Sequence, residues 1–595
     1  MVVCAEEPAK FGDLVVAIDL GTSRSAVAYT IVGYDDELVN VLKLSGASSF
    51  VHGDFKTSTS VLIDKGEVRA FGYDAERAFA EEERQSSEEW MLFKWFKMAL
   101  HKPFESDPLV ECFGGGAEWR LSEILRKCLE FVKADVMKQL WDSRVVQDED
   151  ACKLFWVLTV PAIWSDHARY VMRTAAHKAG LIASEQSRHL FLALEPECAA
   201  VASQADRFQS RLWDEGTRFL IADCGGGTLD ITSHEVVQSS PLKLKEITQP
   251  VGGPFGSTLV DKKFLEFVRN LIGEENFERL QRQEPSEYLG LVKEWEELKV
   301  TFSFDRSRDE WAKINMVNAV MAMGLEAEFG SMVDAWNERN PDKVVRKPPT
   351  KIKLALSFDL MVSFFEDAVS SIVDEIEAAV RACSGLEYVV MAGGFAKCGL
   401  LHAKVRERFA ETSVDVVIAT DPDLLIVKGA AMLGARPTAA IISRKARYTS
   451  GISATTVYDS SQANHRSHED RSFSLHGEKR LEIFKVHVRV GDDIDESDLK
   501  RNPYGPLYDE QESCKISVLI TKERDVFHPG EEGVEELASA DVPFDMDLPF
   551  EDRKVWVKFS FGGTEVRCVI YDATGDREIG SVPINVNFIK RDSHE

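Results

Sequence analysis

Two stretches of the chain, 14–30 (LVVAIDLGTSRSAVAYT) and 218–236 (RFLIADCGGGTLDITSHEV), repeat one pattern about two hundred residues apart. In each stretch an apolar run ends in an aspartate, a turn rich in glycine and threonine follows, and a second β-rich run comes after the turn. This pattern predicts two β-hairpins. A repeat of this length is too long for a solenoid and predicts two similar α/β domains that face each other.

A third strand and three helices are expected around these hairpins. The strand is the start of 387–398 (EYVVMAGGFAKC), which runs into a Gly-Gly pair. Residues 165–180 open with Ser-Asp and end with Gly, as a capped helix does. Apolar residues at three- and four-residue steps predict a long amphipathic helix over 358–383, and 289–303 is expected to be helical too. Strands and helices that alternate up to about residue 436 indicate an α/β architecture.

The pattern of the sequence changes after this point. Residues 455–480 are polar with almost no periodicity and are expected to form a loop, and the acidic segment 531–552 is expected to be a solvated loop. Several β-like runs predict a smaller, mostly β domain, and no long helical segment that could form a lid follows residue 445. The predicted divisions are 12–436 for an α/β domain with its second lobe from about 215, 437–448 for a linker and 449–595 for the β domain.

Charge and cysteine usage narrow the classes of partner. The 595 residues carry a formal net charge of −28, a field that repels nucleic acid and anionic lipid. The chain has no run of about eighteen apolar residues for a membrane span. Ten scattered cysteines without a C-x-x-C pair favour reduced, mostly buried thiols. A cytoplasmic protein is therefore expected, with the nucleus left open and with neither nucleic acid nor a membrane as partner.

Glycine and threonine in the two turns suit the binding of phosphate. Glycine tolerates positive φ and close backbone approach, so successive amides in such a turn form a concavity for anions. Thr22 and Thr228 add hydroxyl donors, and Asp19 and Asp223 end the two entering strands. Facing carboxylates suit Mg²⁺, which binds few protein oxygens and shares substrate phosphates. One such turn alone is more often an ordinary hairpin, whereas the ordered pair predicts a nucleotide site.

These motifs resemble those of the actin, hexokinase and 70 kDa heat-shock ATPase superfamily. VAIDLGTSRSAVAY is similar to its first phosphate loop, IADCGGGTLDIT to its second and VVMAGGFAKCGLL to its adenosine loop. LALEPECAAVA and DPDLLIVKGAAMLGA resemble its two connecting segments, and WEELKVTFS resembles the nucleotide-contact helix of the heat-shock chaperones. WMLFKWFKMALH, VGGPFGSTLVDKKF and FGGTEVRCVIYDATGDREIGSVPINVNF resemble the diverged heat-shock 70 kDa protein 12 branch. The resemblance implies a two-lobed, actin-like (ribonuclease H-like) ATPase fold.

The resemblance also implies a role for each matching residue. Asp19 and Asp223 would organise the Mg²⁺ shell, and Glu195 and Asp230 would orient or activate the attacking water. The phosphates would be cradled by Gly21, Thr22, Ser23, Gly225, Gly226, Gly227 and Thr228. The adenosine pocket would comprise Glu296, Lys299, Ser303, Gly393, Gly394, Lys397 and Asp423. ATP or ADP with Mg²⁺ is thus the expected cofactor.

The chain departs from the chaperone pattern at several positions. The family's arginine on the contact helix is Val300 here, and the adenosine-loop arginine is Lys397. Because arginine stacks on a base better than lysine does, adenine affinity is expected to be weaker or differently built. The catalytic lysine falls near Lys94 or Lys97, of which Lys97 is favoured, and Ser23 replaces a second threonine.

Three features have plainer structural explanations. Glu195 before Pro196 could simply cap a helix. The Gly114–Gly116 run precedes no phosphate-loop lysine and is expected to be a hairpin turn. His465 and His468 have a ligand-like spacing but lie in a polar segment without a second pair, so no metal site is expected there.

The sequence therefore predicts a chaperone-like switch with weak ATPase activity. Mg-ATP would bridge two lobes, hydrolysis would loosen that bridge, and the resulting hinge motion would be transmitted to the C-terminal β domain. The expected partners are ATP and a client polypeptide or regulatory protein. Two alternatives stay open. One is a nucleotide-sensing scaffold with little or no turnover, which Val300 favours. The other is a small-molecule kinase on the same fold, against which the chaperone-like contact helix argues.

Overall fold

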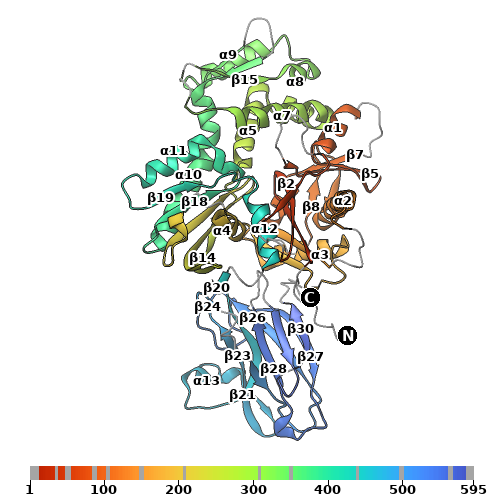
Figure 1. Ribbon diagram of the computed structural model, residues 1–595, viewed down its shortest axis with the longest axis vertical. Coiled ribbons are helices and arrows are strands. Elements are labelled where there is room, and N and C mark those ends of the chain that lie inside the picture. The colour runs from red at the N-terminus through yellow and green to blue at the C-terminus, as the bar shows by residue number, and fades with distance from the viewer. Residues whose placement is uncertain are drawn as a thin grey trace.

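The structure is a computed structural model. Two sheets covered by helices form its larger part, and two antiparallel sheets lie below them in Figure 1. It describes residues 12–583 except 34–37, 47–54, 83–89, 102–106, 147–152, 186, 206–209, 306–307, 309, 348–352, 437–440, 495–500, 561–566 and 576. Part of the predicted linker (437–440), the end of the predicted β domain (584–595), Cys4 and Cys152 therefore lie outside the described residues.

The first sheet is built around the first predicted hairpin, which the structure confirms. In its central strand Leu14, Val16 and Ile18 pack into one core, and Val15 and Ala17 pack into another. A near-continuous apolar run is the pattern of a strand that is covered on both faces. The strand order is β11 (Leu190–Leu194), β10 (Leu154–Val160), β1 (Leu14–Leu20), β2 (Arg24–Ile31) and β3 (Asn40–Leu42), with β4 (Thr57–Ser58) also paired to β2.

The second sheet repeats this plan with the second predicted hairpin at its centre. Its two central strands pair antiparallel, so that Asp223 lies opposite Asp230. The strand predicted in 387–398 is confirmed and ends at Ala392, before the Gly-Gly pair. The order is β19 (Asp415–Ile418), β18 (Tyr388–Ala392), β12 (Arg218–Cys224), β13 (Leu229–Ser239), β14 (Leu242–Gly253), β20 (Ile441–Lys445) and β24 (Asp493–Ile494).

Two helices connect the two sheets: α4 (Glu195–Ala205) and α12 (Leu425–Ala435). They pack against each other and against apolar residues of both sheets, and α12 lies near the middle of Figure 1. A Cβ at Gly429 would collide with the carbonyl group of Cys198, and a Cβ at Gly434 would lie 2.6 Å from Val15. Glycine at these two positions therefore lets α12 approach both α4 and the first sheet closely.

The three predicted helices and the predicted hairpin turn are confirmed, with small shifts at the helix ends. Ser165 caps one helix by accepting a hydrogen bond from the amide of Ala168. The helix predicted from residue 289 begins earlier, at Pro285, because proline is favourable in a first turn. The Gly114–Gly116 turn joins two short paired strands. The elements are α3 (Asp166–Lys178), α7 (Pro285–Thr301), α10 (Phe358–Ala382), β8 (Leu109–Glu111) and β9 (Glu118–Arg120).

Further helices and short sheets cover these two sheets. Phe264 stacks on Trp295 of α7 with ring centroids 4.2 Å apart, which fixes α7 to the helical layer of the second sheet. The helices are α1 (Gly72–Glu82), α2 (Leu121–Asp142), α5 (Thr258–Ile272), α6 (Glu274–Gln283), α8 (Val317–Ala322), α9 (Phe329–Arg339) and α11 (Gly399–Phe409). The strands are β5 (Ser60–Asp64), β6 (Glu67–Phe71), β7 (Trp90–Lys94), β15 (Ala312–Asn315), β16 (Val345–Arg346) and β17 (Lys353–Leu356).

Two antiparallel sheets form the described C-terminal part and share one apolar core. Ile452 and Val518 of one sheet and Val557 and Cys568 of the other belong to that core. The first sheet is β22 (Phe473–Leu475), β23 (Glu478–Val488), β21 (Thr449–Val457), β26 (Ser513–Thr521) and β27 (Glu535–Pro543). The second is β25 (Asn502–Tyr504), β28 (Val555–Ser560), β29 (Arg567–Tyr571) and β30 (Glu578–Pro583).

The loop predicted over 455–480 is wrong in part. It contains the end of β21, a short helix α13 (Ala463–Ser467), the strand β22 and the start of β23. Contacts with residues outside the helix fix its position. Its buried His465 ring packs against Tyr458 and against Phe527, which lies far along the chain. Such contacts leave no periodic pattern in the segment itself.

The solvated loop predicted over 531–552 is also wrong in part. Strand β27 lies within it and pairs antiparallel with β26. Leu537 and Val542 are buried, while Glu535, Glu536 and Asp541 are exposed. The acidic residues that suggested a loop therefore occupy exposed positions of a strand.

The cysteines of the described part fit the expectation of reduced, mostly buried thiols. The eight cysteines described are free thiols, six of them buried. Among the described helices none is both long enough and apolar enough to cross a membrane.

The described end of the predicted linker joins the second sheet as strand β20. It lies parallel to β14, and β24 pairs with its other side. Arg444 donates two hydrogen bonds of 2.8 Å to the carboxylate of Glu197 on α4. The amide of Lys445 donates to Glu246 Oε2 at 3.0 Å. Residues 441–445 are thereby tied to both α4 and β14.

The carboxyl of Glu246 makes this junction sensitive to pH. Burial raises its pKa to about 7 from an ordinary value of 4.5. A carboxyl with a raised pKa stabilises the folded state below its unfolded pKa and loses that contribution as the pH rises through its folded pKa. Glu246→Gln keeps an acceptor oxygen and removes the charge. We therefore expect it to raise the free energy of unfolding by about 1–3 kcal/mol at pH 8 and much less at pH 5. Urea unfolding measures both values, and equal effects at the two pH values contradict the prediction.

Candidate functional site

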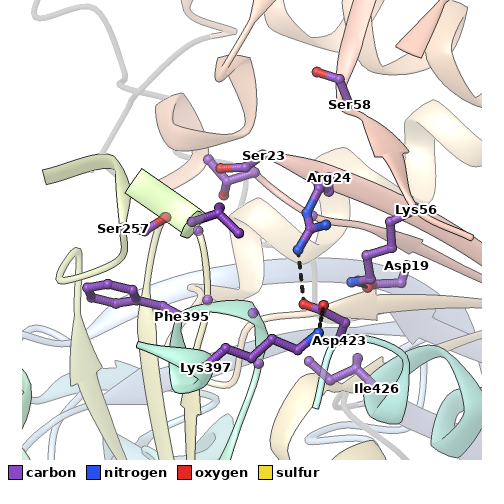
Figure 2. A pocket seen from close by; sticks show the side chains of 18 of the residues that line it. Asp19, Ser23, Arg24, Lys56, Ser58, Ser257, Phe395, Lys397, Asp423 and Ile426 are labelled. Atoms are coloured by element: carbon purple, nitrogen blue, oxygen red, sulfur yellow. Dashed lines mark hydrogen bonds and ion pairs between the residues drawn. The ribbon is translucent and has the colours of Figure 1, made fainter. Parts of the chain in front are cut away.

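A cavity of about 1280 Å³ lies between the two central hairpins. Its wall includes both glycine-rich turns, residues 21–24 and 225–228, together with the C-terminal end of α7 and the loop that follows β18. Figure 2 shows Ser23 and Arg24 of the first turn and Phe395 and Lys397 of the loop after β18 around one space. A cavity of this size accommodates a ligand as large as a nucleotide.

The two glycine-rich turns lie in direct contact. A Cβ at Gly226 would collide with the Ser23 hydroxyl, and a Cβ at Gly227 would lie 2.5 Å from Thr22 Oγ1. Any side chain at these glycines would push the turns apart. Amides and hydroxyls of both turns therefore border the same narrow space, which suits an anion held from two sides.

Two of the predicted acidic residues, Asp19 and Asp230, accept hydrogen bonds from residues in or next to strands of the first sheet. Asp19 accepts from Thr159 Oγ1 at 2.9 Å and from Lys56 Nζ at 2.8 Å. Asp230 Oδ1 accepts from the Ile163 amide at 3.0 Å. Asp19 lines the cavity, whereas Asp230 is fully buried and is not part of its wall. The Ile163 bond joins β13 of the second sheet to the segment after β10 of the first.

The structure separates the two lysines that the sequence left as candidates. Lys97 lines the cavity, and its Nζ donates to Glu195 Oε1 at 3.0 Å. Lys94 is not on the wall and instead donates to Glu76 Oε1 at 2.7 Å. Of the two, Lys97 is therefore the one that can meet a ligand in the cavity.

Lys97 lies beside a pair of aromatic rings, those of Trp164 and His101. Its Nζ lies 5.0 Å from the centre of the Trp164 ring, a cation–π distance. The Trp164 indole donates to His101 Nε2 at 3.1 Å. Burial and the Lys97 charge lower the pKa of His101 to about 4, so its ring stays neutral and can accept that bond. Lys97 is thus held in one place.

Burial dominates the electrostatics of the acidic residues. Burial raises the pKa of Glu195 to about 7, and it raises the pKa of Asp230. Burial and the neighbouring carboxyls raise the pKa of Asp223 well above its usual range. Asp19 differs: burial alone would raise its pKa, but the Lys56 and Lys97 charges and the Thr159 hydrogen bond together outweigh burial and lower the pKa below its usual value. Asp19 is the carboxyl of this group that is held ionised.

These acidic residues suit a magnesium ion whose other ligands are water and phosphate oxygens. Asp223 Oδ1 is buried and has no hydrogen-bond partner in the part of the chain that the structure describes. The described residues include no group of three or more His, Cys, Asp or Glu side chains that could hold a metal by themselves. Mg²⁺ commonly binds through one or two carboxylates, with phosphates and water as its other ligands.

Helix α7 brings two of its three predicted contacts to the cavity. Glu296 and Lys299 lie on the wall, and so does Val300, whose exposure is 80%. Ser303 lies just beyond the helix and is not on the wall; its hydroxyl accepts a hydrogen bond from the Asp305 amide at 3.3 Å. This part of the wall therefore has an exposed aliphatic side chain at the position where the resemblance implied an arginine.

Asp261 is a wall residue that the motifs did not predict. Its Oδ1 accepts from Trp295 Nε1 at 2.8 Å and from Lys299 Nζ at 2.6 Å. The carboxylate thus positions a predicted contact residue. A signal was present in the sequence, since Asp261 is an acid on the apolar stripe of α5, at the spacing of Phe264 and Val268.

The predicted adenosine loop meets the first hairpin through an ion pair. Gly393, Gly394, Lys397 and Asp423 all lie on the wall. Asp423 pairs with Lys397 and also with Arg24, whose Nη2 lies 3.0 Å from its Oδ1 (Figure 2). Arg24 belongs to β2 and was not among the predicted residues. This ion pair links segments of the two sheets across the cavity.

A mixed α/β fold in which two such hairpins border one cavity is consistent with the actin-like fold of the 70 kDa heat-shock family. The chain is 25% identical to Heat shock 70 kDa protein 12B of Homo sapiens, over 99% of this chain and 92% of that protein. It is 24% identical to Heat shock 70 kDa protein 12A of Mus musculus and of Homo sapiens, over 97% of this chain and 91% of each relative. No protein-family model matches the chain. The resemblance to the heat-shock 70 kDa protein 12 branch is thereby confirmed.

Removing the Asp261 carboxylate tests its positioning role. Asp261→Ala leaves the buried Trp295 indole and the Lys299 ammonium without their acceptor. We expect the free energy of unfolding to fall by about 1–3 kcal/mol and ADP binding to weaken. Urea unfolding and calorimetric titration with ADP measure the two effects. Glu266→Ala, an exposed acid on the same helix, is the matched control; equal losses in both variants would rule the role out.

Proposed function

We propose that this chain binds Mg-ATP in the cavity between the hairpins and hydrolyses it slowly, as a chaperone-like switch. The observation that carries the proposal is the meeting of both glycine-rich turns, Glu195 and Lys97 on one cavity wall. Similarity to heat-shock 70 kDa proteins over nearly the whole chain supports nucleotide binding. The proposed organisation is an actin-like domain of two lobes over 12–436 with the second lobe from about 215, a linker over 437–448 and a β domain over 449–595 without a helical lid.

The turns and acidic residues have separate tasks in this proposal. The turns would hold the phosphates through amides and the hydroxyls of Thr22, Ser23 and Thr228. Asp19 and Asp223 would hold Mg²⁺, through water where it does not touch them. A bound Mg²⁺ supplies positive charge that offsets the charge on the phosphates.

Glu195 and Asp230 would act on the attacking water. Lys97 holds the Glu195 carboxylate at 3.0 Å, and the Ile163 amide holds one oxygen of Asp230. A carboxylate fixed in this way can accept a hydrogen bond from water, orient it and take its proton. Loss of the terminal phosphate would then remove contacts that bridge the two turns, and the lobes would separate. We propose that β20 transmits this movement to the β domain, whose partner would be a client polypeptide or regulatory protein.

Asp230→Ala tests whether the site hydrolyses ATP. We expect steady-state turnover to fall at least about hundredfold, because the carboxylate is lost, while ADP affinity changes little since Asp230 is not on the cavity wall. Asp230→Asn, which keeps the shape, is a second variant in case the alanine variant does not fold. Asp214→Ala removes an exposed aspartate outside the cavity and is the matched control. Unchanged turnover in both Asp230 variants would falsify the assigned role.

The raised pKa of Glu195 predicts the pH dependence of turnover. Burial raises this pKa to about 7, so below that pH the side chain is a neutral acid that cannot take a proton from water. We expect kcat/KM for ATP to rise with pH and to level off above an apparent pKa of about 7. Initial rates at a series of pH values give this profile. Glu195→Gln should lose the inflection; the same inflection in the variant would assign it to another group.

A nucleotide-sensing scaffold is the second candidate. Two observations favour it: Val300 stands exposed where the chaperones have arginine, and Lys397 is engaged with Asp423. The same titrations and rate measurements separate the two candidates. Tight ADP and ATP binding without turnover in the unmodified protein would establish the scaffold.

A further inference from the structure

Lys56 places a positive charge among the buried carboxyls at a position that no sequence motif predicted. Its Nζ donates to Asp19 Oδ2 at 2.8 Å, and the residue is 8% exposed. It lies on the cavity wall, and Figure 2 shows its side chain meeting Asp19 close to Asp423. Asp19 is one of the two residues proposed to hold Mg²⁺. A protein cation therefore contacts the same carboxylate that the magnesium ion would use.

The backbone fixes where this lysine lies. The next two residues form β4, which pairs with β2 so that Thr57 lies opposite Ser25 and Ser58 opposite Arg24. Thr57 also donates from its hydroxyl to the Gly46 carbonyl at 2.7 Å. Lys56 is thereby anchored beside the turn that borders the cavity. A lysine held by strand pairing differs from a surface lysine whose ammonium group is free to move.

The balance of charge explains what Lys56 contributes. Lys97 pairs with Glu195, and Lys56 pairs with Asp19. In the part of the chain that the structure describes, lysines pair with two of the four buried carboxyls, so full ionisation would leave two of them without an ion pair. The carboxyls are Asp19, Glu195, Asp223 and Asp230. A nucleotide adds further negative charge, and buried charge without compensation is costly. The Lys56 charge acts on Asp223 as well as on Asp19, and so reaches both proposed magnesium-holding residues.

We propose that Lys56 is a positioning residue that supplies, from within the protein, part of the positive charge needed for nucleotide binding. The inference rests on the proposed nucleotide binding and deepens it. With this ammonium group in place, ADP binds with only weak dependence on Mg²⁺. When it is removed, the site depends on the divalent cation for charge compensation, and the affinity without Mg²⁺ falls steeply.

A purely structural ion pair would behave differently. Removal of Lys56 would then lower the stability of the fold and would affect ADP affinity equally with and without Mg²⁺. The ratio of the dissociation constant in EDTA to that in excess Mg²⁺ separates the two roles, because a general loss of structure cancels in the ratio. This readout does not depend on turnover.

The experiment is calorimetric titration of the full chain with ADP, once in excess Mg²⁺ and once in EDTA. The variants are Lys56→Gln, which removes the charge, and Lys56→Arg, which keeps it. Lys138→Gln, at an exposed lysine on α2, is the matched control. Thermal unfolding of each variant verifies that it is folded.

We expect the ratio for the unmodified protein to stay below about tenfold and that for Lys56→Gln to exceed about a hundredfold. Lys56→Arg and Lys138→Gln should retain the ratio of the unmodified protein. A ratio above about a hundredfold in the unmodified protein would overturn the inference even if Lys56→Gln does not fold. The same ratio in Lys56→Gln as in the unmodified protein would overturn it too. Absence of ADP binding by the unmodified protein in both conditions would instead overturn the proposed function, and this inference with it.

Discussion

Repulsion among buried carboxyls is the constraint on which the site depends. Asp19, Glu195, Asp223 and Asp230 are all buried, and an isolated buried carboxylate is strongly disfavoured. The structure meets this repulsion in two ways: lysines hold two of the groups, and burial shifts the pKa of the others upward. Neither the lysines nor the raised pKa values remove the repulsion completely. Positive charge from these lysines is therefore part of what would let the pocket hold an anion.

Such a cluster can persist only because apolar packing on both sides holds it together. The strands that carry Asp19 and Asp223 are buried at every residue except Arg218, in cores formed with helices on either face. Gly429 and Gly434 let α12 pack closely against α4 and the first sheet. The carboxyls are therefore fixed by strands that cannot relax away from one another without breaking those cores. Rigid sheets are also what keeps the two glycine-rich turns in contact.

The sequence predicted the parts of this site whose residues lie together along the chain. Both hairpins, the strand before Gly393 and the long helices follow from local periodicity and turn residues. The residues that were missed act through contacts between distant segments. Lys56 reaches Asp19 because β4 pairs with β2, and Asp261 reaches Lys299 because α5 packs beside α7. The two predicted loops failed for the same reason, since His465 is held by Phe527 and β27 by its pairing with β26.

The same sheet that carries Asp230 also carries the connection to the C-terminal part. Asp230 lies opposite Gly252 in the pairing of β13 with β14, and β14 pairs in turn with β20. A second connection runs along α4, which begins at Glu195 and is held at Glu197 by Arg444 of β20. Both proposed water-orienting carboxylates are therefore linked to one short strand through covalent structure and hydrogen bonds. β20 is thus tied to β14 by strand pairing and to α4 by the Arg444–Glu197 hydrogen bonds. The two connections therefore meet at residues 441–445.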